Sequence, residues 1–314
     1  IDAPTNLATR EVTENSATVT WDGVRAEIDG YMLTYSSAEG TSREIKVAAG
    51  ATSYQLTSLK PGVLYTVFLW AYKGSRSSRK SMTEAETDID APTNLMTREV
   101  TEDSASVTWN KVQADIDGYM LKYSSLDGSG QEVRVGADST SYRFTGLKPG
   151  VLYTVYVWAI KGARSSKKSS TEAETEIDAP KLKATDVQIQ TSILTWKAPQ
   201  ANIEGYILTY RAEDGSMQTV EKTLTARENR FALSGLEMGK KYIVTLIAYR
   251  GSKRTSYIFM LLFLVGLAYQ FPGLYSDHEE WEHGEWRVHY VNNNRSRTMQ
   301  VYCDMKTDGG GWIV

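Results

Sequence analysis

Short runs in which apolar and polar residues alternate, separated by turn residues, fill the first 88 positions of the chain. Alternation with a period of two is typical of half-buried β-strands, and no stretch here shows a convincing helical period. The pattern predicts seven strands, at 5–12, 17–21, 31–35, 44–47, 53–56, 65–72 and 82–87. Seven antiparallel strands in a segment of this length predict an all-β, immunoglobulin-like β-sandwich.

The same pattern recurs along the chain at a spacing of 88 residues. The tetrapeptide Ile-Asp-Ala-Pro begins at Ile1, Ile89 and Ile177, so both offsets are 88. We therefore expect repeats at 1–88, 89–176 and 177–264, followed by a remainder at 265–314. A tandem array of one domain favours a spacer or an interaction rod over an enzyme with a single buried site.

Composition narrows the possible partners and the kind of core. With 35 basic and 38 acidic residues the formal net charge is −3, so we expect no bulk attraction to nucleic acid or to acidic membranes. Cys303 is the only cysteine, so the repeats must fold by packing without disulfides. The sequence starts at Ile1 without a charged, apolar leader and is expected to be an internal fragment.

Each repeat carries three landmarks of one sandwich family. In the first repeat they are Trp21 in the second strand, Gly30-Tyr31 opening the third, and the segment Leu59-Lys60-Pro61-Gly62-Val63-Leu64-Tyr65. A Pro-Gly corner followed by tyrosine predicts a tyrosine corner, in which the hydroxyl bonds to the upstream backbone. The combination resembles the fibronectin type III domain.

Three such repeats followed by the segment 299–314 resemble the tenascin family, in which they run into a C-terminal fibrinogen-like globe. The resemblance implies that 265–314 is a connector and the truncated start of that globe. It also implies a secreted extracellular matrix glycoprotein that modulates cell adhesion through cell-surface receptors and matrix proteins, without catalysis or cofactors.

One loop per repeat is acidic at the junction before the third strand. It is similar to the Ala-Glu-Ile-Asp-Gly segment through which tenascin-type repeats can engage integrins, and an acidic side chain there can complete the oxygen shell of the receptor's Mg²⁺. The other interpretation is ordinary Asp-Gly turn chemistry, with the isoleucine closing the end of the core. The candidate residues are Glu27, Ile28, Asp29, Asp115, Ile116 and Asp117.

The predicted hairpin after the sixth strand is basic in every repeat. Cations repeated along a rod match the periodic charge of a sulfated glycosaminoglycan, and multivalency strengthens weak single contacts. A solvated, serine-rich hairpin tip is the alternative. The candidate residues are Lys73, Arg76, Arg79 and Lys80, then Lys161, Arg164, Lys167 and Lys168, with Arg250, Lys253 and Arg254 in the third repeat.

The sixth strand also carries an aromatic row. If Tyr65 faces the core, then Phe68, Trp70 and Tyr72 face outward by the period of two. The row predicts either an exposed contact face or a surface on which long basic side chains such as Arg43 and Lys46 stack.

The end of the third repeat departs from the pattern, because 257–265 is apolar where the first repeat has the polar, alternating 81–87. Three interpretations remain: a closing strand with a connector, a disturbed stretch of sequence, or a membrane anchor at 257–271. The anchor would make the chain the ectodomain of a cell-surface receptor, but a membrane span needs about 20 residues.

The last fifty residues hold weaker signals. His278 and His283 are spaced by five, which loses the helical geometry of the zinc-protease motif, so no metal or catalytic site is predicted. Asn294 begins the only glycosylation sequon. The fibrinogen-like resemblance implies a disulfide partner for Cys303 at 274–286, where the sequence has no cysteine.

Overall fold

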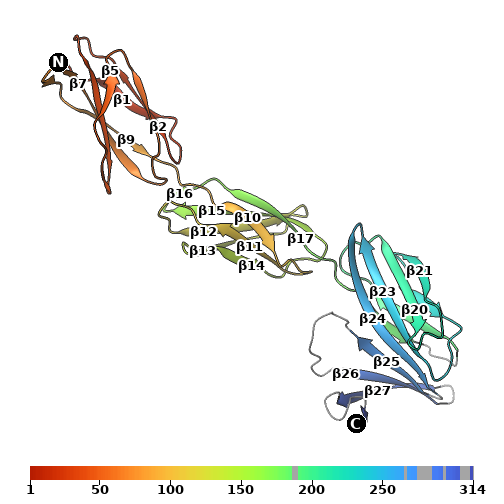
Figure 1. The fold of residues 1–314 in the computed structure, drawn as a ribbon. Helices are drawn as coiled ribbons and strands as arrows, with labels where there is room; N and C mark the ends of the chain where they lie inside the picture. Colours follow the sequence, from red (N-terminus) through yellow and green to blue (C-terminus); the bar gives the residue numbers. More distant parts are fainter. Residues whose placement is uncertain (186–189, 265–266, 274–284, 293–294, 305–311, 314) are drawn as a thin grey trace. The chain divides into compact units, whose positions relative to one another are not determined.

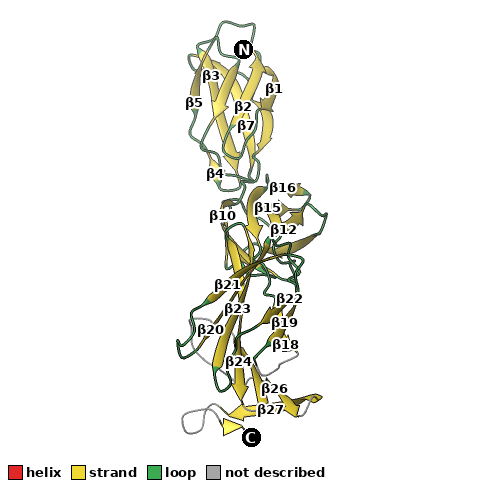
Figure 2. Cartoon of the chain, turned by 90° about the vertical axis from the view of Figure 1, so that its right-hand side faces the viewer, coloured by secondary structure: helices red, strands yellow, loops and turns green. Residues whose placement is uncertain are grey.

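The computed structural model describes residues 1–185, 190–264, 267–273, 285–292, 295–304 and 312–313. Within these ranges every regular element is a β-strand, as Figure 2 shows, which confirms the predicted all-β class. The strands form three successive sandwiches (Figure 1). Asn294, His278 and His283 lie outside the described residues.

The first sandwich contains all seven predicted strands. Its smaller sheet has the order β1-β2-β6, and its larger sheet is built on the central pair β3 and β7, both labelled in Figure 2. Two short pieces, β4 and β8, were not predicted. The bounds are β1 (Thr5–Arg10), β2 (Ala17–Asp22), β3 (Gly30–Ser37), β4 (Gly40–Thr41), β5 (Ile45–Ala48), β6 (Ser53–Leu56), β7 (Leu64–Lys73), β8 (Arg76–Ser77) and β9 (Ser81–Glu86).

The second sandwich repeats this topology, with a smaller sheet β10-β11-β14 and a larger sheet in which β15 pairs with β12, β16 and β17. Its turns follow the same positions as in the first. The bounds are β10 (Thr93–Arg98), β11 (Ala105–Asn110), β12 (Gly118–Ser125), β13 (Gly130–Gly136), β14 (Ser141–Phe144), β15 (Leu152–Lys161), β16 (Arg164–Ser165) and β17 (Ser169–Glu174).

The third sandwich has a smaller sheet β18-β19-β22 and a larger sheet that continues past its last strand to β28. The bounds are β18 (Lys181–Thr185), β19 (Ser192–Lys197), β20 (Gly205–Ala212), β21 (Val220–Thr225), β22 (Arg230–Leu233), β23 (Lys241–Arg250), β24 (Lys253–Leu264), β25 (Leu267–Gly273), β26 (Glu285–Asn292), β27 (Arg295–Asp304) and β28 (Trp312–Ile313).

An edge-to-face aromatic pair joins the two sheets of each sandwich. Trp21 on β2 meets Tyr31 on β3 with ring centroids 5.5 Å apart, and both rings are buried. Trp109 with Tyr119, and Trp196 with Tyr206, repeat this distance. The pair joins the two sheets by aromatic packing in repeats that contain no cysteine.

The predicted tyrosine corner is present. The Tyr65 hydroxyl accepts a hydrogen bond from the Lys60 backbone N–H at 2.9 Å. In the third sandwich, where Pro-Gly is relaxed to Met-Gly, Tyr242 still accepts from the Glu237 N–H at 2.7 Å. The corner therefore depends on the tyrosine rather than on the proline.

The third sandwich differs from the others by the loss of a bulge in each sheet. In the first, the β1–β2 register slips between Thr5 and Ala8 at Asn6, whose φ is +52°. The β18–β19 pairing has no slip. The residue missing from this bulge shortens the distance between Pro180 and the strand tryptophan by one position, which explains why Trp196 lies 87 rather than 88 residues after Trp109.

The second bulge lies on the closing strand. In the first sandwich one extra residue separates the β7–β8 pairing from the β7–β9 pairing. In the third, β24 pairs without interruption with β23, from Arg250 opposite Lys253 to Lys241 opposite Leu262. The apolar run up to Leu264 therefore forms the predicted closing strand, and the connector at 265–314 stays a prediction.

The anchor interpretation of 257–271 is wrong. Residues 253–264 form β24 and residues 267–273 form β25, which pairs with β24. In the part of the chain that the structure describes, no helix has the length and apolar character of a membrane span.

Tyrosine hydroxyls in the core give a testable contrast. The Tyr31 hydroxyl accepts the Val24 N–H at 3.0 Å, whereas Pro199 stands at this place in the third sandwich and has no N–H. Tyr206, the counterpart of Tyr31, has a buried hydroxyl that lacks this backbone donor. We expect Tyr31→Phe to cost about 1 kcal/mol in the unfolding of its sandwich, and Tyr206→Phe to be nearly neutral.

Peptide-resolved hydrogen exchange measures the two sandwiches separately in the 314-residue chain. Tyr119→Phe serves as a second positive case, because its hydroxyl accepts the Val112 N–H at 2.9 Å. Equal losses for Tyr31→Phe and Tyr206→Phe would contradict the assignment of the cost to this hydrogen bond.

Candidate functional site

The acidic loop between β2 and β3, residues 23–29, is named here the B–C loop, and residues 74–75 between β7 and β8 the F–G turn. The two meet through Asp29. Its backbone N–H donates to the Tyr72 carbonyl at 2.9 Å, and its carboxylate Oδ2 accepts the Gly74 N–H at 2.7 Å. Gly74 has a φ of +55°, a conformation that glycine adopts without strain. Asp29 thus holds the F–G turn against the B–C loop.

The hydrogen bond from the glycine N–H of the F–G turn to the acid of the B–C loop is named here the latch, and it exists in every sandwich. Asp117 accepts the Gly162 N–H at 2.7 Å, and Glu204 accepts the Gly251 N–H at 3.1 Å. The acid at this position therefore has a structural role in all three repeats. The turn-chemistry interpretation is supported by these contacts, and Ile28 packs half-buried against the core as that interpretation expects.

The neighbouring acids form ion pairs with the basic hairpin. Glu27 lies 2.8 Å from Lys73, and Asp115 lies 2.5 Å from Lys161. The hydrogen bond and charge of Lys73 lower the pKa of the Glu27 carboxyl below its ordinary value. The acids are about nine-tenths exposed, so each pair adds little stability. The two loops predicted as separate sites form one charged surface.

Sequence analysis missed a third participant, the aspartate of Ile-Asp-Ala-Pro. Asp90 accepts the backbone N–H groups of Gln113 at 2.7 Å and Ala114 at 2.9 Å, both in the B–C loop of the second sandwich. Asp178 makes the equivalent pair of bonds in the third. The recurrence of this aspartate was visible in the sequence, but its partners lie more than 20 positions away.

The basic residues of the predicted hairpins are named here the F–G cations. Some of them form ion pairs, and the others, called free, form none within the described chain. Lys73 and Lys161 pair with the B–C loop, and the Arg164 guanidinium donates to the Glu86 carboxylate at 2.7 Å. By contrast, Arg76, Arg79 and Lys167 are exposed and form no ion pair with any residue that the structure describes. Only part of the predicted basic hairpin is therefore available to a ligand.

The aromatic row is not an exposed contact face. Trp70 and Trp158 are only 8% exposed, and Phe68 and Tyr72 are half-buried. Lys80 covers Trp70, with its Nζ 4.3 Å from the ring centroid, and Lys168 covers Trp158 at the same distance. Stacking beneath basic chains was the right alternative, but Lys80 comes from the bulge before β9 and not from Arg43 or Lys46.

Comparison with known proteins agrees with the repeat and its landmarks. Residues 2–84, 90–176 and 178–259 each match the family described as Fibronectin type III domain. The chain belongs to the fibronectin type III domain family. Its whole length aligns with Tenascin-N of mouse at 48% identity and of human at 47%, and with Tenascin of chicken at 34%. The resemblance to tenascins is confirmed for the fibronectin type III repeats, and its fibrinogen-like part stays a prediction.

The alignments cover all of this chain but 20%, 24% and 18% of those three relatives, respectively. The chain thus spans a quarter or less of their length. A solved segment of two fibronectin type III domains from chicken tenascin is 30% identical, covers 55% of this chain and all of that segment, and has a TM-score of 0.49.

The latch gives a direct prediction for Asp29. Asp29→Ala removes the acceptor of the Gly74 N–H, so we expect this amide to exchange with water about tenfold faster, since hydrogen bonds to charged groups are worth about 1.5–3 kcal/mol. Asp29→Asn keeps an oxygen acceptor and should show a much smaller change. Amide exchange followed by NMR measures both. Unchanged exchange at Gly74 in the alanine variant would show that the latch does not hold the turn.

Proposed function

We propose that the chain is a segment of a secreted, non-catalytic extracellular matrix glycoprotein of tenascin type that modulates cell adhesion. The observation that carries this proposal is the alignment of its whole length with tenascins, at identities up to 48% among the relatives described above. The repeated sandwiches supply a scaffold on which the same loops recur with the same charges. Surface loops on a rigid scaffold are where binding residues concentrate.

The B–C loop is the proposed integrin contact, through Asp29 in the first sandwich and Asp117 in the second. Each carboxylate uses Oδ2 for the latch, while Oδ1 makes no hydrogen bond within the described residues. A carboxylate fixed by one oxygen on a short turn presents the other with little loss of conformational freedom on binding. Such an oxygen is a suitable ligand for a receptor-bound Mg²⁺.

Paired substitutions separate binding from the latch. Asp29→Asn with Asp117→Asn keeps a hydrogen-bond acceptor at both turns but removes the negative charge that a divalent cation requires. We expect cell attachment that depends on divalent cations to fall several-fold, with the Gly74 and Gly162 amides still protected. Asp22→Asn, an exposed acid on β2, is the matched control. Attachment that is equal in the double variant and the parent would reject this loop as the receptor contact.

The free F–G cations are the proposed contact for sulfated glycosaminoglycans. Arg76 and Arg79 in the first sandwich and Lys167 in the second are exposed without ion pairs in the described chain, and Lys80 and Lys168 lie beside them. A few exposed charges bind weakly, so the proposal relies on their repetition along the array.

Removing the free cations of the first sandwich together with Lys80, which covers Trp70, tests the F–G proposal. We expect the triple variant Arg76→Ala, Arg79→Ala and Lys80→Ala to elute from immobilised heparin at lower salt, because three exposed contacts are lost. The charge-matched control is Arg10→Ala, Arg43→Ala and Lys46→Ala, which removes three exposed cations from the same sandwich. An equal shift in both variants would mean that only bulk charge matters.

The receptor-ectodomain alternative lacks support, because its proposed anchor forms strands β24 and β25. The fibrinogen-like character of 265–314, the missing partner of Cys303 and glycosylation at Asn294 remain predictions. A mobility shift after endoglycosidase treatment of secreted protein would test the last of these.

A further inference from the structure

The aspartate of Ile-Asp-Ala-Pro in the second sandwich uses both of its carboxylate oxygens on one loop. Oδ2 of Asp90 accepts the Gln113 N–H, and Oδ1 accepts the Ala114 N–H. Hydrogen bonds from two successive backbone donors to one ionised carboxylate fix the backbone at that point, because they are stronger than bonds between neutral groups. Asp90 is half-buried and Ala114 is buried, so water competes little for these bonds. We name this pair of bonds the clamp.

The clamp and the latch lie on either side of a very short piece of chain. The B–C loop of the second sandwich comprises residues 111–117, and its last residue, Asp117, carries the proposed metal ligand Oδ1. The Asp117 N–H is fixed as well, by a carbonyl of β15 at 2.8 Å. Only Asp115 and Ile116 lie between the clamped Ala114 and Asp117. The clamp therefore limits the backbone conformations in which the Asp117 carboxylate is presented.

The three sandwiches differ in the clamp. In the first, the equivalent Asp2 is exposed and accepts the Arg25 N–H alone among the described residues, at 3.2 Å. In the third, Asp178 forms the full clamp on two successive N–H groups, but the acid of the latch is Glu204, whose bond is 3.1 Å long. Within the described chain, the second sandwich is where a full clamp and a short latch to an aspartate occur together.

We propose that Asp90 is a positioning residue for the receptor contact at Asp117. The proposal rests on the function proposed above, in which Asp117 binds a receptor-bound Mg²⁺. Both Asp90 oxygens already accept hydrogen bonds, so its own carboxylate is poorly suited to a cation. Asp90 acts instead by keeping the B–C loop in one conformation before the receptor binds. A loop that is already ordered loses less conformational entropy on binding, which raises its affinity.

The competing role for Asp90 is stability alone, because the clamp also attaches the start of the second repeat to its sandwich. The two roles differ in what they change. A residue that only stabilises the sandwich changes the fraction of folded molecules, whereas a positioning residue changes the affinity of molecules that are folded. The experiment therefore measures receptor binding and loop order in the same variants.

Substitution of Asp90 in a chain with one remaining receptor contact tests the proposal. Asp29→Asn removes the proposed contact of the first sandwich, so attachment of cells to the 314-residue chain then reports on the second. Adding Asp90→Ala should raise the coating concentration for half-maximal Mg²⁺-dependent attachment about fivefold, because the loop must then be ordered on binding. Asp90→Asn keeps one acceptor oxygen and should give a smaller shift.

A double-mutant cycle shows where Asp90 acts. In the Asp117→Asn background the remaining attachment comes from the first sandwich, and Asp90→Ala should leave it unchanged. The matched control is Asp88→Ala. Asp88 is an exposed acid of the same linker, and its carboxylate forms no hydrogen bond or ion pair with any described residue. Its substitution should leave attachment unchanged in both backgrounds.

Amide hydrogen exchange reports on the loop itself. Asp90→Ala should speed exchange at Gln113 and Ala114 at least about tenfold, because a hydrogen bond to a charged group is lost at each. Unchanged exchange in β11 and β15 shows that the sandwich is folded. If the alanine variant unfolds, Asp90→Asn, which loses one bond, replaces it in the cycle.

Two results overturn the positioning role: attachment that Asp90→Ala leaves unchanged in the Asp29→Asn background, and an equal loss in both backgrounds. The variant that combines Asp29→Asn with Asp117→Asn separates this failure from that of the proposed function. If it attaches cells as the parent does, the receptor contact itself is rejected and the positioning role with it. If it loses attachment while Asp90→Ala does not, the contact stands and Asp90 only stabilises the fold.

Discussion

The edge-to-face contact between a tryptophan of the smaller sheet and a tyrosine of the larger sheet is the interaction on which each sandwich depends. The three repeats contain no cysteine, so nothing covalent joins their sheets. The pair Trp21 and Tyr31 recurs at the same ring distance in the other two sandwiches. Because aromatic packing joins the two sheets at this pair, the loops that connect the strands can vary in length and charge while the sheets stay in register.

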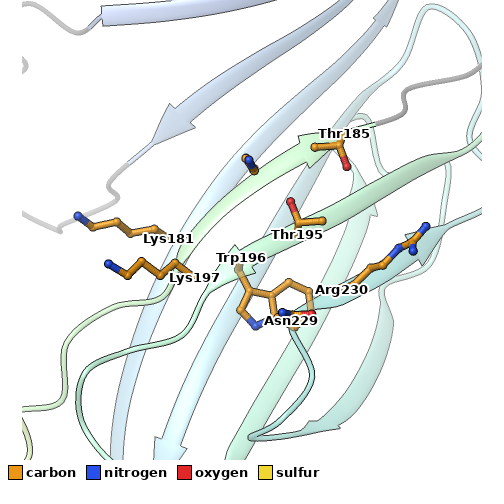
Figure 3. Close-up of a pocket in the computed structure, with 8 residues that line it drawn as sticks. Lys181, Thr185, Thr195, Trp196, Lys197, Asn229 and Arg230 are labelled. Carbon is orange, nitrogen blue, oxygen red and sulfur yellow. The ribbon is translucent and has the colours of Figure 1, made fainter.

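The third sandwich shows what the bulges contribute. In the first two, the closing-strand bulge places Lys80 and Lys168 over the tryptophans of the long strand, and the opening-strand bulge interrupts β1 and β10. In the third, both strands are regular, and Lys181 and Lys183 lie in phase on the outer face of β18, where they line a hollow with Lys197 and Arg230 (Figure 3). One residue more or fewer in an edge strand changes which side chains reach the surface and leaves the core unchanged.

Much of this fold could be predicted from the sequence, because period-two alternation and turn residues are local signals. All seven strands of the first sandwich and the tyrosine corner were predicted in this way. The partners of Asp29 and Asp90 could not be, since Gly74 and Ala114 are brought to them only by the folded topology. Stacking of a basic side chain on Trp70 was among the predicted alternatives, but its source, Lys80, was not predicted, because strand periodicity gives the side of the sheet and not which side chain covers it.

The acidic and basic loops show why a charge pattern alone does not separate structure from recognition. Asp29 is at once the proposed ligand of a receptor-bound metal and the acceptor that fixes the neighbouring turn. These roles are compatible, because a carboxylate has two oxygens and the latch uses one. Asp90 is the opposite case, because both of its oxygens accept N–H groups of the B–C loop and the residue is half-buried. The number of carboxylate oxygens that the fold itself uses therefore separates an acid that positions a loop from an acid that can also bind a ligand, and the charge pattern of a sequence does not contain this number.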